Sequence, residues 1–295
     1  MATSFCTGNG NRDPKDGGAQ RPSGSHELFS KGKKLGMLKS KKLSEVSGLA
    51  ASVANPGMLW TLNDSGNPSE VYLIDDKTNI KMTCVLKGIN NRDWEEIALG
   101  PGPEPGKQYI YVGDIGDNLA QHQYKYIYRF EEPVLRNGEE KVVITNVDEI
   151  KFSLSDERRD AEAFFVDPNT LDIYIVGKWK SPCDLYQLKN SASTKEPLVA
   201  EHIGTLPMSL VVAANFSDDG SELLIKTYKH VFYFKRGDDM SVVSMLKQKP
   251  VELPYEQEPQ GESIAWAIGG KGYYTLSEQK KDEEVHLMFY ERNAD

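Results

Sequence analysis

Carboxylates recur at the starts of short apolar segments along this chain. They comprise four glutamate positions and two preceding aspartates: Glu45, Glu95 or Glu96, Glu162, Glu262, Asp93 and Asp160. A hard cation such as Ca²⁺ takes about six to eight oxygen ligands in a flexible geometry. If folding brings these side chains together, they repel one another unless a cation or a lysine compensates them. Whether these carboxylates come together depends on the secondary-structure elements that carry them.

Those elements repeat with a period of about fifty residues. Each copy has one strand, a turn rich in Pro, Gly, Asp or Asn, and a second strand that ends in a polar cluster. The copies begin at Ser44, Trp94, Ala161, Val211 and Gly261. A third apolar strand follows in each copy, starting at Glu70, Tyr124, Cys183, His230 and His286. KMTCVLKGI, EIKFSL and VVSMLKQK can serve as fourth, outer strands.

This pattern predicts an all-β fold, a single β-propeller of four-stranded antiparallel blades. Five blades fit the copies, and a degenerate sixth between residues 97 and 161 would make six. The N-terminal segment around KKLGML supplies the outer strand of the last blade and closes the ring. The domain is expected over residues 31–295. EEPVLRNGEEKVVITN is read as an excursion on one blade.

In such a blade, the start of the first strand and the end of the second lie at one face. The predicted metal ligands at this channel mouth are Glu45, Glu96, Asp114, Glu162 and Glu262. The predicted ligand-binding rim comprises Asn63, Asp64, Asp93, Asp117, Asn118, Arg159, Asp160, Lys178, Lys226 and Glu278. Val212 interrupts the series of glutamates.

Other interpretations of these residues stay open. The glutamates can accept backbone N–H bonds from neighbouring blades and tie the channel together. Lys178 and Lys226 can neutralise the ring internally, without a metal. The GDIGDN segment can be an oxygen-ligand loop or a tight turn whose side chains bond their own backbone.

Composition excludes several functional classes. The net charge of −9 and pI near 5.2 argue against nucleic-acid binding, which needs clustered Lys and Arg. The sequence has no H-E-x-x-H, G-x-S-x-G or phosphate-binding glycine loop. No apolar run reaches the length of a membrane span. We expect a monomer.

Residues 1–30 are rich in Gly, Pro, Ser and Asp and predict a disordered leader or tether. A trimmed bacterial lipoprotein with its lipid anchor at Cys6 and an ordinary leader both fit. An extracytoplasmic location, whether periplasmic, secreted or lipid-anchored, is expected.

Six motifs, in order, resemble a family of secreted bacterial β-propeller proteins: NDSG, DWEEIA, GDIGDN, DAEAFFVDP, KTY and QGESIAW. The resemblance covers about Ser44 to Glu278 and implies a propeller outside the cytoplasm, without supplying a reaction. The glutamate series is more distantly similar to calcium-centred propellers such as apyrase-type nucleotidases and β-propeller phytases.

Two functions follow as hypotheses. The first is a binding or scaffold module whose acidic mouth holds Ca²⁺ and presents a surface to a small-molecule or protein ligand. The alternative is a calcium-dependent hydrolase of phosphoesters or other esters, with the metal polarising an oxygen. Whether the chain is an enzyme stays open at this point.

Overall fold

The computed structural model describes residues 28–178, 181–190, 196–280 and 283–294. These residues form strands joined by turns, which confirms the all-β prediction. The strands are rich in β-branched and aromatic residues, which suit a pleated, packed surface. No helix among the described residues is long and apolar enough to cross a membrane.

Consecutive strands pair antiparallel into sheets. The first sheet runs through β2 (Val46–Ala51), β3 (Leu59–Asn63), β4 (Glu70–Ile74) and β5 (Ile80–Leu86). The second runs through β6 (Trp94–Pro101), β7 (Gln108–Asp114), β8 (Lys125–Glu131) and β10 (Asp148–Leu154). The third runs through β11 (Ala161–Val166), β12 (Ile173–Gly177), β13 (Cys183–Leu188) and β14 (Leu198–Leu206). The fourth runs through β15 (Val211–Phe216), β16 (Glu222–Thr227), β17 (Val231–Lys235) and β18 (Val251–Leu253).

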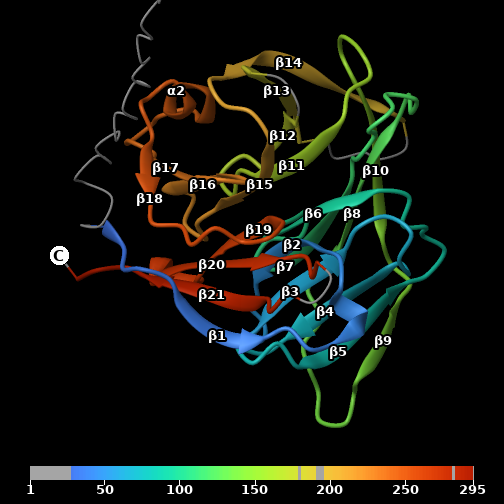
Figure 1. Cartoon of the computed structure of the whole chain (residues 1–295). Coiled ribbons are helices and arrows are strands. Elements are labelled where there is room, and N and C mark those ends of the chain that lie inside the picture. The colour runs from blue at the N-terminus through green and yellow to red at the C-terminus, as the bar shows by residue number, and fades with distance from the viewer. Residues whose placement is uncertain (1–27, 179–180, 191–195, 281–282, 295) are drawn as a thin grey trace, which may run out of the picture.

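The fifth sheet contains both ends of the described chain. Its order is β19 (Gly261–Trp266), β20 (Gly272–Ser277), β21 (His286–Glu291) and then β1 (Lys33–Met37). Figure 1 shows the blue N-terminal strand beside the red C-terminal ones. The expected pairing of the KKLGML segment with the last strand is therefore present.

The first strands of the five sheets lie side by side in a ring. β2 contacts β6 and β19, β6 contacts β11, β11 contacts β15, and β15 contacts β19. Figure 1 shows these strands near the centre of the molecule and the last strands of the sheets at its periphery. The approach is close: a Cβ on Gly48 of β2 would lie 2.7 Å from the backbone N of Ile97 in β6.

Apolar side chains fill the space between neighbouring sheets. Between the first two sheets, Trp60 and Leu62 pack with Ile110, Val112 and Tyr128. Equivalent clusters occupy the other four spaces. Both faces of most strands are thus buried, which is why the strands read as nearly continuous apolar runs.

Two outer connections depart from simple repetition. β9 (Lys141–Ile144), within the predicted excursion, pairs parallel with β5 of the first sheet. β10 pairs parallel with β14, which joins the second and third sheets at their outer edges. The excursion, residues 131–146, thus links the second sheet to the first through β9.

The expected outer strand VVSMLKQK is wrong. Its first five residues form α2 (Val242–Leu246), and β18 is the outer strand of the fourth sheet. The Ser241 side chain accepts a hydrogen bond from the backbone N–H of Ser244 and caps the helix. Val242, Met245 and Leu246, at helical spacing, are buried. Two short 3₁₀ segments lie at Lys41–Leu43 and Ile268–Gly270.

Residues 28–30, which the sequence assigns to the leader, are among the described residues. Phe29 is fully buried, with its ring centre 5.2 Å from that of Tyr273, and it forms a β-bridge with Arg292. The rest of the predicted leader, residues 1–27 with Cys6, lies outside the described residues.

Candidate acidic mouth

A β-bulge marks the start of the first strand in every sheet. The register between first and second strands shifts between Val46 and Gly48, Trp94 and Glu96, Ala161 and Ala163, Val211 and Ala213, and Gly261 and Ser263. The extra residues are therefore Ser47, Glu95, Glu162, Val212 and Glu262. A bulge inserts one unpaired residue and re-aims the side chains around it.

The bulges correct the sequence alignment in two sheets. Ser47 corresponds to Glu162 and Glu262, so Glu45 lies outside the series; Glu45 is exposed and accepts a bond from the Asn67 amide at 2.6 Å. In the second sheet the corresponding residue is Glu95, not the predicted Glu96.

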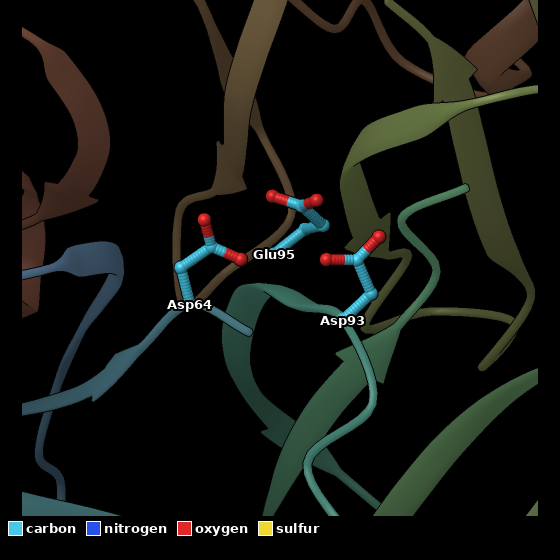
Figure 2. A group of neighbouring side chains, drawn as sticks. All are labelled: Asp64, Asp93 and Glu95. Carbon is cyan, nitrogen blue, oxygen red and sulfur yellow. The ribbon is translucent and has the colours of Figure 1, made fainter. Parts of the chain in front are cut away.

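Three carboxylates of the first two sheets converge on one space. Asp64 follows β3, Asp93 precedes β6, and Glu95 is the bulge residue of β6. Each offers an oxygen, and these oxygens lie within 4.8 Å of one another. Figure 2 shows the three carboxyl groups facing a common space. We call Asp64, Asp93 and Glu95 the open set.

Hydrogen bonds between the Asn91 side chain and the backbone hold the open set together. The Asn91 amide donates to the carbonyls of Asn63 and Asp64, at 3.1 and 2.8 Å, and its side-chain oxygen accepts from the Trp94 N–H at 3.1 Å. Asn91 therefore ties the end of β3 to the start of β6. Gly116 leaves the room that the carboxylates of Glu95 and Asp93 occupy, because a Cβ there would collide with both.

The electrostatics of the open set are unfavourable for three charges. Burial, followed by the charges of Asp64 and Asp160, raises the pKa of Asp93 to about 6. Burial, followed by Asp64 and Asp93, raises the pKa of Glu95 well above its ordinary value. Burial raises the pKa of Asp64 as well, with a smaller effect from Glu45. Each shift shows that the fold resists the ionised forms.

A second group of ligand oxygens shares Glu95. Glu95, Asp160 and Glu162 each contribute one oxygen, again within 4.8 Å of one another. Glu162 forms a close ion pair with the Lys178 ammonium. Asp160 accepts a bond from the backbone N–H of Asp117 at 2.8 Å. This group, the Lys178 set, thus differs from the open set in containing a lysine.

Glu96 and Asp114 do not join either set. Glu96 is fully buried and accepts backbone N–H bonds from Ile97 at 3.0 Å and Ala214 at 3.1 Å. A further backbone bond comes from Leu49. Glu96 therefore ties three first strands together, the structural role left open by the sequence. Asp114 pairs with Arg92 at 3.0 Å, a partner that sequence reasoning missed.

Glu262 in β19 of the fifth sheet and Lys226 in β16 of the fourth belong to one densely bonded region. Glu262 accepts a bond from the Tyr228 hydroxyl at 2.5 Å. The Lys226 ammonium, fully buried, donates to the carbonyls of Gly261 and Thr227. Burial, followed by repulsion from Glu262 and Asp64, raises the pKa of Glu278 to about 8.

The remaining rim residues are mostly engaged in local structure. Asp117 accepts the backbone N–H groups of Gln121 and His122, which supports the turn interpretation of GDIGDN, and the Asn63 amide donates to the Lys42 carbonyl at 2.6 Å. Arg159 pairs with Asp156, Glu157 and Asp184. A cavity of about 250 Å³ beside the Lys178 set is lined by Asp117, exposed Asn118, Arg159, Asp160, Lys178 and others.

Comparison with known proteins adds little to this geometry. No family model matches the chain, and no curated protein matches it. Among solved structures, a luciferin-regenerating enzyme is similar at 11% identity and a TM-score of 0.45. The match covers 87% of this chain and 95% of that one. A likeness of this size implies nothing about the function of the acidic mouth.

Proposed function

We propose that the chain is a five-bladed β-propeller that acts as an extracytoplasmic binding protein and holds a divalent cation, calcium first, at its acidic mouth. The propeller assignment is supported by five groups of four strands. In four groups the strands run in chain order from the centre outward, and in the fifth β1 supplies the outermost strand. It is also supported by the ring in which β19 returns to β2. A closed ring of this kind removes the inner sheet edges.

The cation is supported chiefly by the environment of Glu95. Its residue exposure is 5%, and no described residue donates a hydrogen bond to it. Two further carboxylates of the open set lie beside it. A buried carboxylate without a partner is costly and calls for a compensating charge. A bound cation supplies that charge and uses all three carboxylates as ligands.

The two lysines do not remove this need. Lys178 is engaged with Glu162, and Lys226 bonds two backbone carbonyls on the side of Glu262. Among the described residues, no lysine or arginine forms an ion pair with Asp64, Asp93 or Glu95. Internal neutralisation thus covers part of the mouth and leaves the open set.

Calcium suits the open set because all its ligand atoms are oxygens. Calcium accepts carboxylates in one- or two-oxygen modes and completes its shell with carbonyls or water. Extracellular calcium modules work with dissociation constants of about 10⁻⁴ to 10⁻³ M, which agrees with an extracytoplasmic setting. Shell positions left to water are where a small-molecule or protein ligand would bind the metal.

The charge balance argues against the phosphoester hydrolase. One divalent cation does not neutralise the three carboxylates of the open set, and Asp160 lies beside them. An anionic phosphoester would approach a site that remains negative. The basic rim residue Arg159 is already paired with three carboxylates. We therefore propose binding rather than phosphoester hydrolysis.

Thermal unfolding in chelator and in calcium tests the cation. At a calcium concentration a hundred times the dissociation constant, the fold should gain about 2.7 kcal/mol by mass action. Glu95→Gln keeps the side-chain shape and removes one ligand charge, so most of this gain should disappear.

The matched control is Glu140→Gln, which removes a carboxylate from an exposed residue in the loop before β9. It should retain the full calcium response. Identical melting curves of the parent protein in chelator and in calcium would overturn the proposal.

A further inference from the structure

The mouth contains two overlapping groups of cation ligands, and they share one residue. Glu95 belongs both to the open set and to the Lys178 set. In each group the oxygens lie within 4.8 Å of one another. The two groups therefore define two adjacent cation positions, with the Glu95 carboxylate between them.

We propose that the Lys178 ammonium occupies the second of these positions, so that the mouth binds one divalent cation and loss of Lys178 opens a second site. This inference rests on the proposed cation in the open set. It adds that a built-in lysine sets the number of metal ions.

The burial of Lys178 supports this role. Its residue exposure is 7%, although lysines are almost never so buried unless paired. Its ammonium contacts Glu162, and its charge partly opposes the rise in pKa that burial causes at Glu95 and Asp64. The ammonium thus acts on both groups of carboxylates, as a cation at the second position would.

The backbone fixes the origin of this side chain. Lys178 follows β12 directly, and its N–H donates to the Asp160 carbonyl at 3.4 Å. Its carbonyl accepts from the Leu210 N–H at 2.8 Å, which ties it to the start of the next sheet. The Lys178 side chain therefore starts beside Asp160, and its ammonium extends to Glu162 at the bulge of β11.

Charge explains why the two occupants exclude each other. A divalent ion among Glu95, Asp160 and Glu162 would lie within a few ångströms of an ammonium that contacts Glu162. Like charges that close, in a partly buried site, repel strongly. Without the ammonium, the same carboxylates have the composition of a hard-cation site, with Glu95 as a bridge to the first ion.

The test is calcium stoichiometry, measured by equilibrium dialysis with elemental analysis of the folded protein. The parent should bind one ion and Lys178→Met two. Lys178→Gln, which keeps a hydrogen-bond donor for Glu162, should also bind two and covers the case in which the methionine variant does not fold. The double variant Lys178→Met with Glu162→Gln should return to one, because the second position loses a ligand.

Lys107→Met is the matched control, since it removes an exposed lysine paired with Glu104 and Glu131, outside the mouth. It should bind one ion. A parent that binds two ions, or lysine variants that still bind one, would overturn the role of Lys178 while leaving the open set intact. A parent that binds none would overturn the proposed function itself.

Discussion

Two buried acidic regions of the molecule treat their carboxylates differently. In the connection between β18 and β19, Glu258 accepts bonds from the hydroxyls of Tyr255 at 3.0 Å and Thr275 at 2.9 Å, close to Lys226. We call Lys226, Glu258 and Glu262 the paired set. In the open set, Glu95 has carboxylates as neighbours and no described hydrogen-bond donor. The protein supplies hydrogen-bond donors to other buried carboxylates. The lack of a described donor at Glu95 therefore indicates a partner from outside the chain.

The same contrast separates two consecutive residues. Glu96 is buried with three backbone N–H groups around its oxygens. Glu95, one position earlier, points into the mouth because it is the bulge residue. Burial alone therefore does not identify a binding residue; the supply of donors does.

The largest effect is expected from breaking the paired set. Lys226→Met removes a fully buried ammonium and leaves Glu258 and Glu262 without its charge. Removing one partner of a buried charge pair costs about 3–5 kcal/mol, because the other charge remains buried. Urea denaturation in chelator should show this loss.

A double variant separates charge from packing in that experiment. Lys226→Met with Glu258→Gln removes the buried carboxylate as well, so it should recover part of the lost stability. If Lys226→Met were as stable as the parent, the paired set would not be held by its charges and the comparison would fail.

The opposite sign is expected in the open set. Since the fold raises the pKa of Glu95 through burial and neighbouring carboxylates, Glu95→Gln should relieve repulsion in chelator. We expect the free energy of unfolding to rise by about 1 kcal/mol, which is the repulsion between two unit charges roughly 4 Å apart in water. Glu162→Gln, in the same mouth, should instead destabilise, because Lys178 loses its ion-pair partner. Equal losses from both variants would show that the two groups do not differ.

The sequence predicted the strands and several of the carboxylates that lie close together. It did not predict which carboxylates have hydrogen-bond donors or a lysine beside them. The repeat placed β2, β6, β11, β15 and β19 correctly, because alternating strands and Gly-, Asp- or Pro-rich turns are local signals. Asp64, Asp93 and Asp160 were predicted as rim residues from their places at the ends and starts of these strands.

The errors arise where a single residue, or a contact formed only on folding, determines the local structure. A bulge shifts the register by one position, and this shift exchanges Glu96 for Glu95 without a local sequence signal. The five-residue helix α2 has an apolar composition that a strand shares. Arg92 and Asn91 act on residues brought near only by folding, on β7 and after β3.

The smallest expected effect is a change in stability with pH, which arises from Lys226 in the paired set. Burial is the main cause that lowers the pKa of Lys226 to about 8, with Glu258 and Glu262 opposing it. Between about pH 8 and 10 the unfolded chain keeps the lysine proton that the folded chain releases, so stability should rise with pH. Measured against Lys226→Met with Glu258→Gln, which has neither titrating group, the parent should gain about 1–2 kcal/mol from pH 8 to 9.5. Urea denaturation in chelator at these pH values measures the difference. A difference that is flat or falls with pH would mean that the paired set holds Lys226 charged at no cost, so that its carboxylates compensate the ammonium fully.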